Sequence, residues 1–217
     1  MTLDLSLYLV TDSAQAAAAG HRLVEVVRRA VAGGVSAVQV RAKDATGREF
    51  LDTVLAIADE LPDTVALIVN DRVDVFLAAR AAGRRVTGVH VGQSDLPVGV
   101  VRDLVGPDAV IGLSASTPEQ LALAAAEPAR VDYIGIGALH ATRTKPDAPA
   151  ALGLAEFAKL VGLSALPAVA IGGVGRADLA ALRACGAAGA AVVSAICSAP
   201  HPETAARELR AAWGAAA

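Results

Sequence analysis

The stretch "VQVRAKD", residues 38–44, places Gln39, Arg41 and Lys43 at every second position, with small apolar residues between them. Successive side chains of a β-strand point to opposite faces, so this spacing predicts a strand that carries all three polar side chains on one face. Polar groups that face a core without partners are costly. The stretch therefore predicts a strand that contributes to a polar binding site.

Strands of this kind recur along the chain and alternate with helical segments. The expected strands cover residues 7–11, 37–42, 66–70, 88–92, 110–115, 133–138, 168–173 and 190–195. The expected helices cover residues 21–32, 47–60, 72–82, 97–104, 118–126, 153–162, 175–184 and 202–213. Apolar strands that are each followed by a helix predict a parallel sheet. The pattern favours an α/β fold, a (β/α)8 TIM barrel with residues 1–217 as a single domain, over an open doubly wound sheet.

The composition argues against two classes of partner. The net charge is −3, from 19 basic and 22 acidic residues, so no polybasic field favours nucleic acid. No uncharged apolar run reaches the roughly 20 residues that span a bilayer, and the N-terminus lacks the features of a secretory signal. Cys185 and Cys197 show no metal-binding spacing, which predicts two reduced, buried thiols in a cytoplasmic protein. The sequence leaves the oligomeric state open, with a homo-oligomer among the alternatives.

Two acidic residues follow neighbouring expected strands. Asp71 follows the third strand and Asp95 the fourth. Active sites of such barrels lie at the carboxyl ends of the strands, and neighbouring strands run about 4.8 Å apart, so the two carboxylates can converge. Mg²⁺ is typically held by one or two carboxylates together with substrate phosphates. The pair therefore predicts a magnesium site, and the alternative is that each aspartate is a helix N-cap.

Cationic residues are expected at the same edge. Arg41, Lys43 and Lys145 would surround the mouth of the pocket, where a guanidinium fork and ammonium groups suit phosphate oxygens. The amide of Gln39, deeper in the pocket, could read the edge of a polar ring. For any one lysine, a solvated surface charge is the alternative.

A second anion site is expected after the seventh and eighth strands. Gly172 and Gly173 allow close approach of the backbone, and Ser194 follows the last strand. A plain turn is the alternative for the glycine pair. The long connection that begins with "HATRTK", residues 140–145, resembles a lid that closes over an anion through its hydroxyl and cationic side chains.

Other catalytic patterns are missing from the sequence. It contains no Walker motif, HExxH, GxSxG or complete GxGxxG. His90 lies inside an expected strand, where its apolar neighbours favour a hydrogen-bonded core residue over a catalytic base.

Taken in order, "YLVTD", "QVRAK", "VND", "GVHVGQSD", "GLSAS", "TRTK", "IGGV" and "VVSAI" resemble the motifs of the thiamine-phosphate synthases. The resemblance covers essentially the whole chain. It implies a (β/α)8 fold, a requirement for Mg²⁺ and two small-molecule substrates, a hydroxymethylpyrimidine diphosphate and a thiazole phosphate. These would be joined with release of pyrophosphate and without a protein nucleophile.

The resemblance also implies roles for individual residues. The implied contacts to the pyrimidine diphosphate are Gln39, Arg41, Lys43, Asn70, Ser114 and Lys145. The implied contacts to the thiazole phosphate are Thr142, Arg143, Thr144, Gly172, Gly173, Val193 and Ser194, and the implied metal ligands are Asp71 and Asp95.

Three positions depart from the family pattern. Ala42 stands where Glu is common, Ala138 where Pro is common and Ser116 where His is frequent. A paralogous thiazole tautomerase is the nearest alternative, although it is expected to lack the paired aspartates and to use a histidine near "SAST". A non-catalytic barrel that binds phosphorylated metabolites is the alternative from another class.

Overall fold

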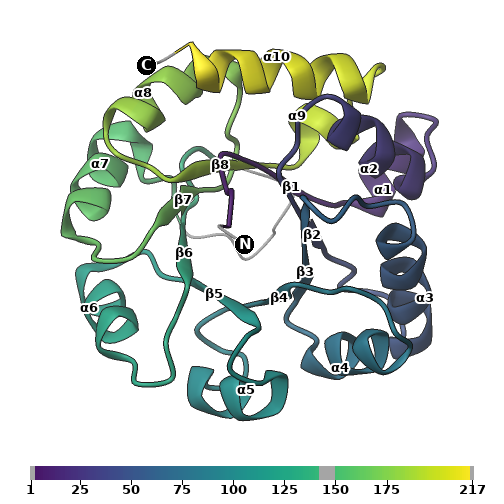
Figure 1. Ribbon diagram of the computed structural model, residues 1–217. Coiled ribbons are helices and arrows are strands. Elements are labelled where there is room, and N and C mark those ends of the chain that lie inside the picture. Colours follow the sequence, from purple (N-terminus) through teal and green to yellow (C-terminus); the bar gives the residue numbers. More distant parts are fainter. Residues whose placement is uncertain (1–2, 142–149, 216–217) are drawn as a thin grey trace.

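The computed structural model describes residues 3–141 and 150–215. Within these residues, eight parallel strands pair in sequence order and close into a barrel, with helices around its outside (Figure 1). The strands are β1 (Leu7–Val10), β2 (Ala37–Val40), β3 (Ala66–Asn70), β4 (Gly88–Val91), β5 (Val110–Ser114), β6 (Tyr133–Ile136), β7 (Ala168–Ala170) and β8 (Gly189–Val192). The predicted (β/α)8 class is confirmed.

The helices follow the expected alternation, with additions. Those that match predicted segments are α2 (Leu23–Ala32), α3 (Gly47–Ala58), α4 (Val73–Ala81), α5 (Val98–Val105), α6 (Pro118–Ala126), α7 (Gly153–Leu163) and α10 (Pro202–Gly214). The predicted segment 175–184 is divided into a 3₁₀ turn, η1 (Arg176–Asp178), and α8 (Leu179–Ala184). Two short helices were not predicted, α1 (Ser13–Ala18) and α9 (Ser194–Cys197).

Most predicted strands run one or more residues too far. The second strand was expected to reach residue 42, but β2 ends at Val40. The backbone N–H of Arg41 donates to Thr11 Oγ1 at 3.0 Å, so a side chain of the neighbouring segment takes the place of a ladder carbonyl. Alternating polarity continues past this point, which is why the pattern overestimates the strand.

Two apolar layers hold the barrel together. The larger layer fills the space between the strands and the helices, with Phe50, Phe76 and Phe157 almost fully buried in it. The smaller layer lies inside the barrel and contains Tyr8, Tyr133 and small side chains from other strands.

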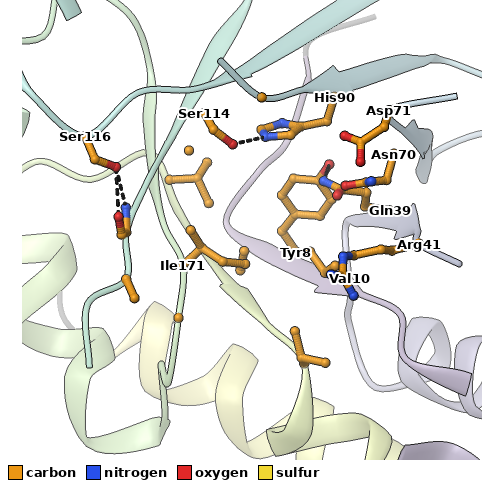
Figure 2. Close-up of a pocket in the computed structure, with 18 of the residues that line it drawn as sticks. Tyr8, Val10, Gln39, Arg41, Asn70, Asp71, His90, Ser114, Ser116 and Ile171 are labelled. Atoms are coloured by element: carbon orange, nitrogen blue, oxygen red, sulfur yellow. Dashed lines mark hydrogen bonds between the residues drawn. The ribbon is translucent and has the colours of Figure 1, made fainter. Parts of the chain in front are cut away.

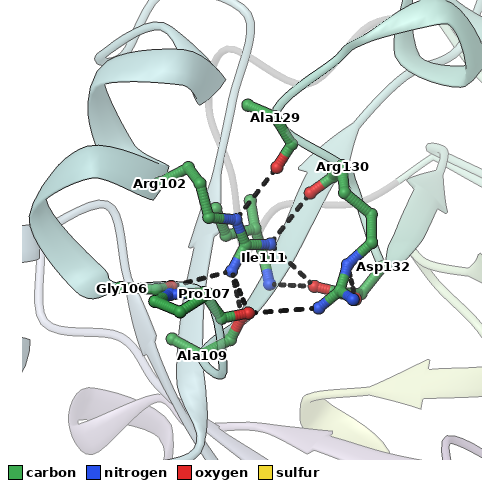
Figure 3. Close-up of polar contacts among 8 residues, drawn as sticks. All are labelled: Arg102, Gly106, Pro107, Ala109, Ile111, Ala129, Arg130 and Asp132. Carbon is green, nitrogen blue, oxygen red and sulfur yellow. Dashed lines mark hydrogen bonds and ion pairs between the residues drawn. The ribbon is translucent and has the colours of Figure 1, made fainter.

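At the opposite end of the barrel, an arginine ties α5 to the beginnings of two strands (Figure 3). The side chain of Arg102 is 12% exposed, and its guanidinium donates to carbonyl oxygens around it and pairs with Asp132 at 3.2 Å. Asp132 also accepts from the backbone N–H of Ile111 at 2.8 Å. We call Arg102, Arg130, Asp132 and the carbonyls they contact the Arg102 cluster.

Two further expectations concern the surroundings of the protein. None of the described helices is long and apolar enough to cross a membrane. Both cysteines are free thiols. Cys197 is buried as predicted, but Cys185 is only half-buried, because it lies at the end of α8 where the chain returns to the surface.

Candidate active site

A cavity of about 630 Å³ opens at the carboxyl ends of the strands. Each strand of the described barrel contributes to its lining, from Tyr8 of β1 to Ala191 of β8. Figure 2 shows Asp71, Asn70, Gln39 and Arg41 gathered on one side of the cavity, with Ser114 and Ser116 on the other. Such a concave site with a few converging polar groups is typical of small-molecule binding.

The two aspartates predicted to hold a metal ion meet at this cavity. Burial raises the pKa of Asp71 above its usual 3.8, and the neighbouring carboxylate of Asp95 raises it further. Asn70 and Lys43 act in the opposite direction, through a hydrogen bond and a positive charge. A carboxyl whose charge is disfavoured by burial and by a neighbouring carboxylate marks a place where a cation would bind favourably.

Neither aspartate is a helix cap in the structure. The N-cap of α4 is Arg72 and that of α5 is Pro97, and neither helix has a side-chain cap hydrogen bond. Asp71 adopts a φ of 58°, a left-handed conformation that is uncommon for non-glycine residues. Asp95 Oδ2 accepts from the backbone N–H of Gly92 at 2.7 Å, which fixes the turn after β4. The N-cap alternative is therefore not what the structure shows.

The donor set around these aspartates fits Mg²⁺. The described residues contain no group of three or more His, Cys, Asp or Glu side chains that could hold a metal ion. A site closed by protein ligands alone, as for structural Zn²⁺, is therefore not formed here. A pair of carboxylates that leaves the remaining positions to water and substrate oxygens is the usual arrangement for Mg²⁺.

Two of the predicted cations, Arg41 and Lys43, line the same cavity, although they lie beyond the end of β2. Lys43 is close enough to lower the pKa of Asp71 by its charge. The interpretation of all three polar residues as alternate positions of one strand is thus wrong beyond Gln39, while the expectation that they share one pocket is confirmed.

Gln39 and Ser114 lie deeper in the cavity. Gln39 is 5% exposed, and its Nε2 donates to the hydroxyl of Tyr8 at 2.9 Å. Ser114, at the end of β5, contacts His90 Nε2 through its Oγ at 3.0 Å, as Figure 2 shows. Both residues have the placement that a buried recognition surface requires.

The expected second anion site is also part of the cavity. Gly172, Gly173, Val193 and Ser194 line the side formed by β7 and β8. Gly172 and Gly173 have φ values of 93° and 67°, and a Cβ at Gly172 would lie 2.6 Å from Ala138 Cβ. Larger residues would be strained and would collide, so the backbone itself forms this wall.

Thr142, Arg143, Thr144 and Lys145 lie outside the described residues. The residues just before them are described, and His140 Nε2 lies 2.8 Å from Asp178 Oδ1 of η1. This contact joins the connection after β6 to the connection after β7.

The positions that depart from the family pattern can be described. Ser116 Oγ donates to Gly137 O at 2.8 Å and accepts from Gly137 N at 3.2 Å, which joins the ends of β5 and β6. Ala138 packs against Gly172. Ala42 is half-buried and packs against the outer apolar layer. Of the three residues, Ser116 and Ala138 line the cavity.

Sequence reasoning missed Tyr8 and Tyr133, which line the cavity floor, and assigned His90 to the core alone. His90 is 9% exposed and hydrogen-bonded, as expected for a core residue, yet it also faces the cavity. The sequence signal that could have identified these residues is the one that identified Gln39. Each has a polar group in an otherwise apolar strand, at a position that points into the barrel.

The comparisons with known proteins agree with this geometry. A family model described as thiamine monophosphate synthase matches residues 7–196. The chain belongs to this family. The thiamine-phosphate synthase of Solidesulfovibrio magneticus is 53% identical over 208 residues, covering 95% of this chain and 94% of the relative. That of Azorhizobium caulinodans is 47% identical over 208 residues, with 95% and 94% covered.

Solved structures support the family and the fold. The thiamine phosphate pyrophosphorylase of Pyrococcus furiosus superposes with a TM-score of 0.85 at 31% identity, covering 99% of this chain and 98% of that chain. A 3-hexulose-6-phosphate synthase has a TM-score of 0.71 at 19% identity, covers 96% of this chain and 99% of its own, and shows only a shared fold. The resemblance to thiamine-phosphate synthases inferred from the motifs is confirmed.

Proposed function

We propose that this member of the thiamine monophosphate synthase family is a transferase that joins 4-amino-2-methyl-5-(diphosphooxymethyl)pyrimidine to thiazole phosphate, giving thiamine phosphate and pyrophosphate. The full-length likeness to proteins that carry the name thiamine-phosphate synthase supports this activity. The cavity supports it independently, since it offers one wall suited to a diphosphate and another suited to a second phosphate.

The diphosphate is proposed to bind beside Asp71 and Asp95. Arg41 and Lys43 line this wall and would contact its oxygens, with Lys145 as a third proposed cation. Mg²⁺ bound by the two aspartates would neutralise charge on the same oxygens. Together these groups favour the electron distribution of a departing pyrophosphate over that of the bound ester.

The bond changes need no protein nucleophile. The bond between the pyrimidine methylene carbon and the diphosphate oxygen breaks, and its electron pair leaves with pyrophosphate. The lone pair of the thiazole nitrogen forms the new carbon–nitrogen bond, and the aminopyrimidine ring delocalises the positive charge that develops on its methylene. The wall of Gly172, Gly173, Val193 and Ser194, with Thr142, Arg143 and Thr144, is proposed to hold the thiazole phosphate so that its nitrogen faces that carbon.

The convergence of Asp71 and Asp95 in one cavity with Arg41 and Lys43 carries the proposal. The test is to incubate the purified protein with both substrates and to measure thiamine phosphate and pyrophosphate, with Mg²⁺ and with a chelator. We expect equal amounts of the two products, and only when Mg²⁺ is present. Product formation at the same rate in the chelator would overturn the role of the metal.

The same assay separates the alternatives. A thiazole tautomerase would isomerise its thiazole substrate without releasing pyrophosphate, and a binding barrel would leave both substrates unchanged. The presence of both aspartates and of Ser116 in place of a histidine favours the synthase.

The partners that we propose are the two small-molecule substrates, without nucleic acid or membrane, with the oligomeric state left open, and the location that we propose is the cytoplasm. The free thiols and the absence of a membrane-crossing helix among the described residues are compatible with this assignment.

A further inference from the structure

A continuous hydrogen-bond chain crosses the floor of the cavity. Gln39 Nε2 donates to Tyr8 Oη at 2.9 Å, and Tyr8 Oη lies 2.7 Å from Tyr133 Oη. Tyr133 Oη lies 2.9 Å from His90 Nδ1, and His90 Nε2 lies 3.0 Å from Ser114 Oγ. Its two ends are residues implied as contacts to the pyrimidine diphosphate, whereas the three middle residues have no such assignment.

The neighbouring strands leave room for this chain. A Cβ at Gly112 of β5 would lie 2.4 Å from Tyr133 Oη and 2.5 Å from His90 Nδ1. A Cβ at Gly135 of β6 would lie 3.3 Å from His90 Cε1. β5 and β6 thus have glycines where the Tyr133 hydroxyl and the His90 imidazole lie. The contact between Tyr133 and His90 depends on these glycines.

The orientation of the Gln39 amide sets the direction of the chain, because its Nε2 is the atom that faces the Tyr8 hydroxyl. Tyr8 is 1% exposed and Tyr133 is fully buried, and burial raises the pKa of both hydroxyls above the usual 10, so each carries one hydrogen at neutral pH. Tyr8 Oη accepts a hydrogen bond from Gln39, so the hydroxyl hydrogen of Tyr8 needs an acceptor of its own. The neighbouring acceptor is Tyr133 Oη. The opposite direction would leave the Tyr8 hydrogen buried without an acceptor among the described residues, which is costly.

The remaining donors follow from this direction. With this direction Tyr133 Oη donates a hydrogen bond to His90 Nδ1, and an imidazole that accepts at Nδ1 carries its hydrogen on Nε2 and donates to Ser114 Oγ. The hydroxyl hydrogen of Ser114 is left to face the cavity. At the other end of the chain, Gln39 Nε2 is engaged with Tyr8 Oη. The side-chain oxygen of Gln39 is therefore the atom that can accept a hydrogen bond from a ligand.

We propose that Tyr8, Tyr133 and His90 are positioning residues that fix Gln39 as an acceptor and Ser114 as a donor, so that the cavity floor selects a heterocycle with an amino group at one edge and an unprotonated acceptor at another. The inference rests on the proposed function, and it deepens that function by assigning the recognition of the aminopyrimidine to residues beyond those that touch it. Neither tyrosine is required to contact the reacting atoms.

The chain is tested by breaking it at two points. Tyr8→Phe and Tyr133→Phe each keep the ring and remove one hydroxyl. We expect each variant to raise the KM for the pyrimidine diphosphate by about tenfold, because the ends of the chain lose their fixed orientation, and to leave the KM for thiazole phosphate unchanged. The double variant should match the single variants, since a chain that is already broken loses little from a second break.

A control variant separates orientation from general loss of stability. Thr87→Val removes a hydroxyl that accepts from Leu67 N at 3.0 Å, at the opposite end of the barrel. Thermal unfolding of all variants should show comparable losses, while the KM for the pyrimidine diphosphate should change only in the tyrosine variants.

Unchanged KM values in the tyrosine variants would overturn the proposal, and so would effects of the two substitutions that multiply in the double variant. If a tyrosine variant fails to fold, His90→Gln and His90→Leu supply the test: Gln can still donate to Ser114 and should bind the pyrimidine diphosphate more tightly than Leu, and equal binding contradicts the proposal. An inactive wild-type protein would instead count against the proposed function, so the two failures are distinguishable.

Discussion

The Arg102 cluster and the pair of aspartates lie at opposite ends of the same barrel, and their charges are compensated differently. Asp132 in the Arg102 cluster meets Arg102, Arg130 and the N–H of Ile111. Asp71 instead meets another carboxylate, and its pKa is raised by burial and by Asp95. The charge of Asp132 is thus compensated by its protein partners, whereas that of Asp71, a proposed metal ligand, is compensated only in part, by Asn70 and Lys43.

The strongest way to break this contrast is to neutralise Asp71. Asp71→Asn keeps the shape of the side chain and removes a proposed metal ligand, so product formation should fall by a factor on the order of 10²–10³. The initial rate of pyrophosphate release measures the effect. Asp52→Asn, at an exposed position of α3, is the matched control and should keep the wild-type rate. A wild-type rate in Asp71→Asn would show that the aspartates do not assist departure of the diphosphate.

A second test removes the positive charge of Arg102, at the end of the barrel opposite the cavity. Arg102→Met leaves several carbonyl oxygens without their donor and removes one of the two guanidinium groups that pair with Asp132, and should lower the free energy of unfolding by about 2–4 kcal/mol. Urea unfolding measures this loss, while kcat of the folded variant should stay near the wild-type value. Arg28→Met, on the exposed side of α2, should change neither quantity. Equal stability of Arg102→Met and the wild type would contradict a structural role for the cluster.

The pH dependence of stability sharpens the comparison. A carboxyl whose pKa is higher in the folded state stabilises the fold while it is protonated, and this contribution is lost as the pH rises through the folded-state pKa. For Asp71 that pKa lies above 3.8, so the wild type should lose stability toward neutral pH relative to Asp71→Asn. Urea unfolding of the wild type and of Asp71→Asn, from acidic to neutral pH and in the presence of a chelator, measures the difference between their free energies of unfolding.

Magnesium should reverse this loss at neutral pH. Because an ion that binds only the folded state stabilises it by mass action, Mg²⁺ should raise the melting temperature of the wild type and not that of Asp71→Asn. Identical shifts in both proteins would place the ion elsewhere.

The smallest expected effect concerns the contact between two rim connections. His140→Ala removes the bond to Asp178, which joins the connections after β6 and β7. Since 44% of the His140 side chain is exposed, we expect the KM for thiazole phosphate to rise only about twofold to fivefold. His201→Ala, at an exposed position before α10, should leave this KM unchanged. A change in the KM for the pyrimidine diphosphate alone would contradict this assignment.

The order of the strands was predictable because each apolar run is followed by a helical pattern, and the closed barrel follows from that order. Strand ends were less predictable, since hydrogen bonds such as that from Arg41 N to Thr11 Oγ1 are not visible in the alternation of side chains. The helix α1 was missed although Asp12 caps it through Gln15 N, a signal present in "DSAQ".

The candidate site was predictable where residues follow strands, as for Asp71 and Asp95. Tyr8 and Tyr133 were missed because aromatic side chains in apolar strands are usually core residues, and nothing in their spacing shows that their hydroxyls meet. That contact depends on the register of β1 and β6 across the barrel, which only the closed structure defines.

The missing side chain at Gly112 has a consequence for redesign. Tyr133 fits inside the barrel only because its neighbour on β5, Gly112, has no side chain. The residues at positions 112 and 133 therefore compete for the same volume. An alanine at 112 would collide with both the Tyr133 ring and His90 Nδ1, so a smaller residue at 133 alone would not make room for it. Changing the preferred heterocycle of this barrel therefore calls for coordinated exchanges on adjacent strands, and libraries that vary single positions would miss them.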